Sequence, residues 1–134
     1  MSLSISELQG VDQEISGKLK AAGLSNSDKL LAAMAEPQDR KVWSEKLGIP
    51  EKALLELANR ADLARVDGIG AAYSDLLEFA GVDTIAELAT RNPDNLLQKL
   101  IDVAAEHGIG RLPTQVEVHD WVAQAKELGR GIYY

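Results

Sequence analysis

The residues that most often support metal binding are sparse in this 134-residue chain, and their spacing is unfavourable. Its two histidines, His107 and His119, stand twelve positions apart beside Glu106 and Asp120, a set of side chains that could in principle hold a metal ion. The histidines lack the spacing that would place them together on one helix face. We therefore expect no metal site, and we expect both histidines to face solvent near helix ends.

Catalytic arrangements of other kinds are also missing from the sequence. The chain contains no cysteine, which excludes thiol nucleophiles, disulfides, thiolate zinc sites and iron–sulfur clusters. No nucleophile stands in a recognisable pattern with a base, and the acidic residues are spaced like solvated helix faces rather than paired catalytic carboxylates. These acidic residues include Glu7, Glu14, Asp75, Glu78 and Glu87. We predict that the protein is not an enzyme and takes neither a cofactor nor a small-molecule substrate.

The elements that would position any binding site are predicted to be helices only. Ala, Leu, Glu and Lys dominate, and apolar residues recur at three- and four-residue spacing, which is typical of an all-α protein. Capping residues and prolines that begin helices stand at Asp12, Ser25 with Asp28, Pro37, Pro50, Thr84 with Glu87, Asn92 before Pro93, and Thr114 with Glu117. Glycines that end helices stand at Gly23, Gly48, Gly81, Gly108 and Gly129. The helix from Pro50 is expected to break near Asn59 or Asp62.

An internal repeat gives the domain organisation. The pattern from Leu8 to Leu30 matches the pattern from Val66 to Leu88 at a constant offset of 58 residues, and each copy then reaches a proline. Two stacked helical units with this spacing would bury a shared face. We expect a single domain over residues 1–134, with one unit at about 4–58 and a second at about 59–130. Trp43 and Trp121 recur with apolar neighbours at helical spacing, so we expect them in the core.

The residues around two glycines resemble a known motif. Residues 63–70 place a hydrophobe-glycine-hydrophobe-glycine turn before Leu76, Leu77 and the segment Ala80–Val82, and this resembles the helix-hairpin-helix motif. With residues 84–88, 91–93, 111–113 and 121–128, nearly the whole chain is similar to domain-of-unknown-function family 4332. The resemblance implies a tandem helix-hairpin-helix fold, a SAM-domain-like helical bundle in which two pseudo-repeated units pack into one compact domain.

The same resemblance implies a contact to nucleic acid. In helix-hairpin-helix proteins, backbone N–H groups of the glycine turn and of the following helix start hold a phosphate, because unpaired amides and the positive end of a helix dipole suit an anion. Carried over to this chain, the candidate residues in the second glycine turn (residues 66–70) and the helix after it are Gly68, Ile69, Gly70, Ala71 and Ala72, with Arg65 as the nearest cation.

The chain departs from the DNA-binding pattern at several positions. Ala71 and Ala72 stand where binding members often place a proline and a basic residue, so a charge-assisted contact is missing. In the first glycine turn (residues 8–12), Asp12 replaces the second glycine and Glu14 takes the basic position, leaving only Lys18 and Lys20 as nearby cations. We expect the second turn to be competent for phosphate and the first to be structural, with Asp12 capping its own helix.

A third glycine pair, Gly108 and Gly110, precedes Arg111. We interpret this pair as a helix end and a connector, since Pro113 and Thr114 fit the start of the next helix. Arg111 is nevertheless the best single basic contact for a phosphate on this side of the molecule.

Charge bears on the choice of partner. Residues 1–60 carry 8 basic and 9 acidic side chains, whereas residues 61–134 carry 6 and 12, and the net charge of the chain is −7. A field of this sign repels nucleic acid at long range and favours a basic protein partner, although it also simply promotes solubility.

Two hypotheses for function follow. The first is a non-enzymatic binding module with weak, sequence-independent affinity for the DNA or RNA backbone, centred on Gly68 to Gly70. The second is a protein–protein adaptor in which the glycine turn is only structural. With no signal peptide at the N-terminus and no apolar run long enough to cross a bilayer, we expect a cytoplasmic protein that does not associate with membranes.

Overall fold

A computed structural model describes residues 3–8 and 12–134, and regular structure in these residues is entirely helical. The all-α prediction is therefore confirmed. The short 3₁₀-helix η1 (Ile5–Glu7) precedes the α-helices, whose bounds are α1 (Gln13–Ala21), α2 (Ser27–Met34), α3 (Pro37–Leu47), α4 (Glu51–Leu63), α5 (Ala71–Phe79), α6 (Ile85–Ala89), α7 (Pro93–Glu106) and α8 (Gln115–Leu128). The part of the first glycine turn at Gln9, Gly10 and Val11 lies outside the described residues.

Most helix starts follow the capping residues that the sequence offers. The Asp12 carboxylate accepts a hydrogen bond from the Ile15 N–H at 2.8 Å, and Thr114 with Glu117 forms a complete capping box. The prediction of Ser25 as the cap of α2 is wrong. Asn26 takes this role by accepting from the Lys29 N–H at 2.9 Å, and the Ser27 hydroxyl, fully buried, accepts from the Leu3 N–H.

The expected break in α4 near Asn59 or Asp62 is also wrong. Helix α4 runs unbroken from Glu51 to Leu63 with Asn59 and Asp62 both buried. The Asp62 carboxylate accepts from the Ile85 N–H at 2.8 Å and from the Arg65 guanidinium at 2.9 Å, so the charge is satisfied by residues outside the helix.

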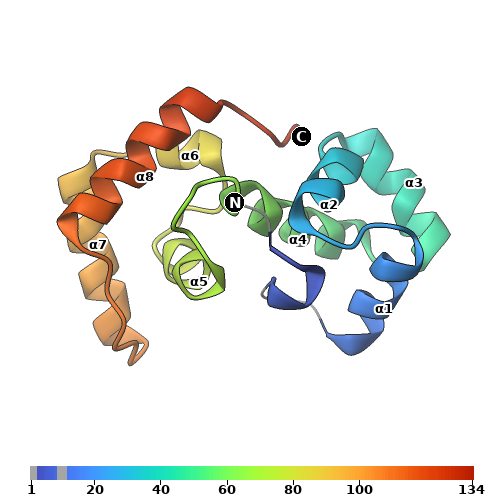
Figure 1. Cartoon of the computed structure of the whole chain (residues 1–134), viewed down its shortest axis with the longest axis horizontal. Coiled ribbons are helices and arrows are strands. Elements are labelled where there is room, and N and C mark those ends of the chain that lie inside the picture. The colour runs from blue at the N-terminus through green and yellow to red at the C-terminus, as the bar shows by residue number, and fades with distance from the viewer. Residues whose placement is uncertain (1–2, 9–11) are drawn as a thin grey trace.

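The buried apolar side chains form two clusters, joined by α4. The N-terminal core contains Leu19, Leu30, Met34, Leu54 and Leu57 among others, and the C-terminal core contains Val66, Ile69, Leu77, Leu100 and Trp121 among others. The end of α4 serves both, since Ala61 lies in the N-terminal core and Leu63 in the C-terminal core. Helices α1, α2 and α3 accordingly gather at one end of the molecule, and α6, α7 and α8 at the other (Figure 1).

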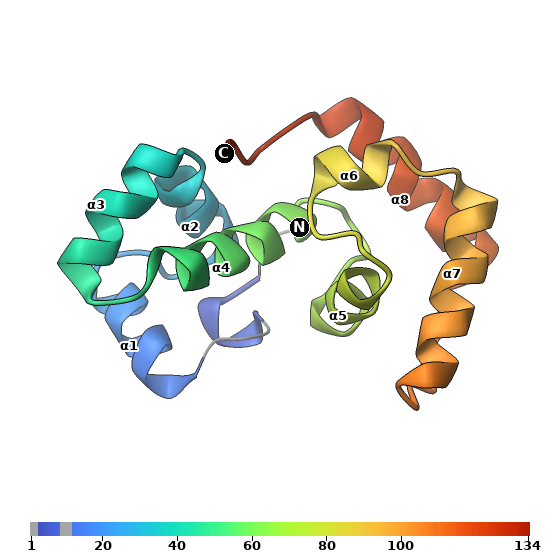
Figure 2. The ribbon, with the colours of Figure 1, turned by 180° about the vertical axis from the view of Figure 1, so that it is seen from behind.

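Residues 129–134, here called the C-terminal strap, connect the two ends of the molecule a second time. The strap leaves α8 and returns to α2 and α3, as both views show (Figures 1 and 2). Ile132 is buried in the N-terminal core, and the Tyr133 N–H donates to the Ala35 carbonyl at 2.8 Å. The Arg40 guanidinium, itself buried, donates to the carbonyls of Met34, Ala35 and Tyr133.

None of the helices in the described part of the chain combines the length and the apolar character that crossing a membrane requires.

Packing of the strap is testable through Ile132. We expect Ile132→Ala to lower the free energy of unfolding by about 2–4 kcal/mol, because it leaves a cavity in the N-terminal core. Urea titration followed by circular dichroism measures this loss. Val116→Ala is the matched control: Val116 is 78% exposed, and its truncation should change stability by less than about 0.5 kcal/mol. A loss at Ile132 no larger than that of the control would show that the strap does not pack in solution.

Candidate functional site

The second glycine turn is held to the body of the protein by its hydrophobic residues. Val66 and Ile69 are fully buried in the C-terminal core, and the Ile69 N–H donates to the Val66 carbonyl at 3.2 Å. Gly68 between them is exposed and has φ +99°, a conformation that favours glycine. The turn therefore presents its backbone outward on a fixed apolar base.

Two side chains of α8 contact the turn. The indole of Trp121, 1% exposed, lies so close that a Cβ at Gly68 would be 3.1 Å from Trp121 Nε1. Gln124 accepts from the Asp67 N–H at 2.9 Å and donates to the Asp67 carbonyl at 3.1 Å. The core position predicted for Trp121 is confirmed. The role of Gln124 has no signal in the sequence, because it depends on a contact across 57 residues.

Helix α5 begins directly after the turn, and no described side chain caps it. Gly70 is the N-cap residue and has no side chain to accept from the first N–H groups of the helix. The N–H groups of Ala71, Ala72 and Tyr73 have no acceptor among the described residues, as expected for the first turn of an uncapped helix. Ala72 is exposed, and Gly70 and Ala71 are partly exposed, so an anion could reach this helix end from solvent.

Arg111 reaches the same helix through Tyr73. Its guanidinium carbon lies 4.9 Å from the centroid of the Tyr73 ring, and its Nε lies 3.4 Å from the Tyr73 hydroxyl. Tyr73 is the third residue of α5, and its ring contacts Trp121 at a centroid distance of 5.0 Å. Arg111 thus contacts the first turn of the helix that follows Gly68 and Gly70. Tyr73 makes this contact and was missed by the sequence analysis, although its place in the first turn of the helix could have suggested it.

Arg65, the other predicted cation, is placed differently. Its guanidinium pairs with Asp62 and donates to the carbonyls of Leu128 and Gly129 at 3.0 and 3.2 Å. These carbonyls belong to the end of α8 and the start of the strap. A cation is favourable there because the C-terminus is the negative end of the helix dipole. The observed contacts of Arg65 therefore serve the fold, and of the two predicted cations it is Arg111 that contacts the first turn of α5.

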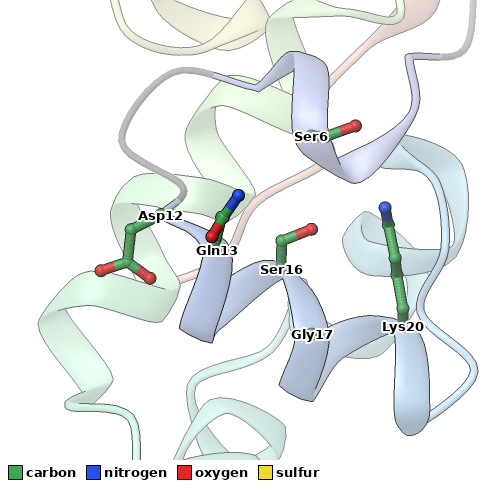
Figure 3. Close-up of a pocket in the computed structure, with 6 residues that line it drawn as sticks. All are labelled: Ser6, Asp12, Gln13, Ser16, Gly17 and Lys20. Atoms are coloured by element: carbon green, nitrogen blue, oxygen red, sulfur yellow. The ribbon is translucent and has the colours of Figure 1, made fainter.

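The helix after the first glycine turn has a different electrostatic start. Asp12 occupies the Ile15 N–H, and Glu14 adds a second carboxylate in the first turn of α1. Lys18 pairs with Glu14 at 3.5 Å. Lys20 lines a shallow pocket in which Ser6 of η1 faces the side of α1 that carries Gln13 and Ser16 (Figure 3). An anion approaching the start of α1 would meet carboxylates that the start of α5 does not have.

Each histidine contacts one side chain described below rather than a set of metal ligands. His119 Nε2 lies 2.8 Å from Asp94 Oδ1, and hydrogen bonds from His119 and Gln115 lower the pKa of Asp94 below its usual value. His107 stacks on Phe79 with ring centroids 4.0 Å apart. The described residues contain no group of three side chains that could hold a metal ion.

Comparison with known proteins places the chain among uncharacterized relatives. Residues 9–128 match the model of a family described as "Domain of unknown function (DUF4332)". The chain is also similar to the "Uncharacterized 22.9 kDa protein in nqo2 3'region" of Paracoccus denitrificans, with 37% identity over 110 residues. The match covers 80% of this chain and 47% of the relative, so the chain spans about half the length of that protein. No solved structure matches the chain significantly.

The two glycines of the turn should differ in how much stability a methyl group costs. We expect Gly68→Ala to lower the free energy of unfolding by about 2–3 kcal/mol, because it combines a positive φ with a close contact to Trp121. Gly70→Ala should cost less than about 1 kcal/mol, since its φ is ordinary and a Cβ there meets nothing within 4 Å. Urea unfolding of both variants tests this order, and equal losses would contradict the turn geometry.

Proposed function

The chain belongs to the DUF4332 family of domains of unknown function, and from its geometry we propose a non-enzymatic module that binds the phosphate backbone of a nucleic acid. The phosphate would lie at the start of α5, held by the N–H groups of Ala71 and Ala72, with the outward backbone of Gly68 and Gly70 leaving room for its oxygens. Arg111 would supply the nearby positive charge.

One observation carries this proposal. Among the α-helices of residues 12–134, α5 alone begins with neither a capping side chain nor an acidic residue in its first turn. Every other start is either capped or carries a carboxylate such as Asp39 in α3 or Glu51 in α4, which offsets the positive end of the helix dipole. The uncompensated start of α5 is therefore the most favourable backbone position for an anion.

The arrangement of the helices supports two pseudo-repeated helix-hairpin-helix units in this proposal. Helices α1 and α5 each span nine residues and begin 58 positions apart, as do the starts of α2 and α6. In the C-terminal unit, α5 begins with neither a capping side chain nor an acidic residue in its first turn. In the N-terminal unit, Asp12 caps α1 and Glu14 lies in its first turn. On this view, one unit binds and the other supports it.

The proposed binding is weak and independent of base sequence. Backbone amides contact phosphate oxygens, which are the same at every nucleotide. One guanidinium beside the site, in a chain of net charge −7, provides little long-range attraction. Affinity should fall steeply with salt because counterions are released from the nucleic acid on binding.

A charge inserted at Gly70 tests the site directly. Fluorescence anisotropy with short labelled DNA and RNA, single- and double-stranded, should give dissociation constants of about 1–100 μM at low salt. Gly70→Glu should weaken binding about tenfold or more, because a carboxylate at the helix start would interact with the positive end of the helix dipole and repel phosphate. Gly17→Glu is the matched control: Gly17 is exposed in α1, a Cβ there meets nothing within 4 Å, and the variant adds the same charge in a different helix.

Each result discriminates between the hypotheses. Selective loss in Gly70→Glu, with unchanged helicity, supports the site at α5. Equal loss in both glutamate variants would mean that overall charge decides the affinity and would refute this site. No binding by the wild-type protein at low salt would refute nucleic-acid binding and leave the protein adaptor.

Arg111 gives a second, independent test of the same site. Arg111→Gln should weaken binding and reduce the slope of log affinity against log salt by about 1, because one phosphate contact is lost. Lys52→Gln, an exposed cation of α4, is the control and should leave the slope unchanged. The same titrations repeated over a series of salt concentrations measure both slopes, and an unchanged slope in Arg111→Gln would remove Arg111 from the site.

A further inference from the structure

A groove at the opposite end of the molecule from α7 has no part in the proposed function. It lies between α1 and α3, has a volume of about 450 Å³, and is lined by Lys18, Ala21, Ala22, Trp43, Lys46 and Leu47. Helices α1 and α3 lie at this end in both views (Figures 1 and 2). The α1 segment, including its C-cap Ala22, and α3 each contribute three residues at positions i, i+3 and i+4. Residues with this spacing lie on the same face of a helix.

The groove is lined by both apolar and basic side chains. Each set of three contains one lysine and two apolar residues, and none of the described residues that line the groove is acidic. Trp43 packs against the N-terminal core yet remains partly exposed, so the core position expected for it is only partly reached. The Lys46 ammonium lies 5.0 Å from the centroid of the Trp43 ring, and Lys18 pairs with the exposed Glu14 at 3.5 Å.

We propose that this groove binds an acidic amphipathic helix of another protein. The alanine, leucine and tryptophan side chains of the lining suit the aliphatic or aromatic anchors of such a helix, which recur at the same i, i+3 and i+4 spacing. Its carboxylates would meet the ammonium groups of Lys18 and Lys46. In a chain of net charge −7, this is a local basic and apolar surface with complementary charge to such a partner.

The geometry favours a peptide over single-stranded nucleic acid. Binding of single strands uses bases stacked on open aromatic faces along a positively charged channel. Here Lys46 covers one face of the Trp43 ring, and the other apolar residues of the lining are aliphatic rather than aromatic. The net negative charge of the chain also opposes a polyanion more than a helix that carries a few carboxylates.

Selection from a random peptide library tests the chemistry of the partner without knowing its identity. Short phage-displayed peptides are selected on the wild-type protein and counter-selected on the double variant Lys18→Glu, Lys46→Glu. The enriched peptides should combine Asp or Glu with bulky apolar residues at helical spacing. Their affinity, measured by anisotropy with a labelled peptide, should fall about tenfold or more in the double variant.

The control carries the same change of charge in the other half of the molecule. Lys99→Glu, Lys126→Glu reverses two exposed lysines of α7 and α8 and should retain peptide binding, and circular dichroism should show that both double variants keep their helices. Enrichment without an acidic bias, or equal loss in the two double variants, would overturn the proposal. Labelled single-stranded DNA that loses affinity only in Lys18→Glu, Lys46→Glu would assign the groove to nucleic acid instead. A concentration-dependent dimer that this variant abolishes would assign it to a second copy of the chain.

Discussion

A buried carboxylate organises the middle of this protein. Asp62 has no exposed surface, and a charge in that position must be paired and hydrogen-bonded. Its two oxygens accept from the start of α6 and from Arg65, and Arg65 in turn holds the carbonyls at the end of α8. A Cβ at Gly131 would collide with both side chains, so a larger residue in the strap would require the pair to shift. Four segments thus converge on one ion pair at the junction of the two cores.

Local rules of helix formation were enough to predict the fold class and most helix starts from the sequence, because Asp12, Thr84, Asn92 and Thr114 act on residues within one turn of themselves. The same rules could not choose between Ser25 and its neighbour Asn26, since both are good caps and only the burial of Ser27 decides. The continuity of α4 through Asp62 was equally hidden, because its hydrogen-bond partner lies 23 residues away.

The spatial arrangement of the candidate residues could be predicted where they are neighbours in the chain, but not where the contacts join distant segments. Gly68 to Ala72 form one continuous turn and helix start, so their proximity follows from the sequence. Arg65 is as close along the chain, yet its guanidinium is taken by the end of α8, 63 residues later. Arg111 lies 38 residues from Tyr73 and contacts it only because α5 packs in the C-terminal core. The different contacts of the two arginines therefore follow from tertiary structure.

The strap also has a consequence for the order in which the protein acquires its structure. As the chain leaves the ribosome, the helices of the N-terminal core emerge first, but the side chain of Ile132 that completes this core emerges after all eight α-helices of the described residues. Contacts between residues so far apart along the chain slow folding, because a long loop must close before they form. The N-terminal core thus waits for the strap, which follows α8 in the chain, and a nascent chain would expose an incompletely filled core in the meantime.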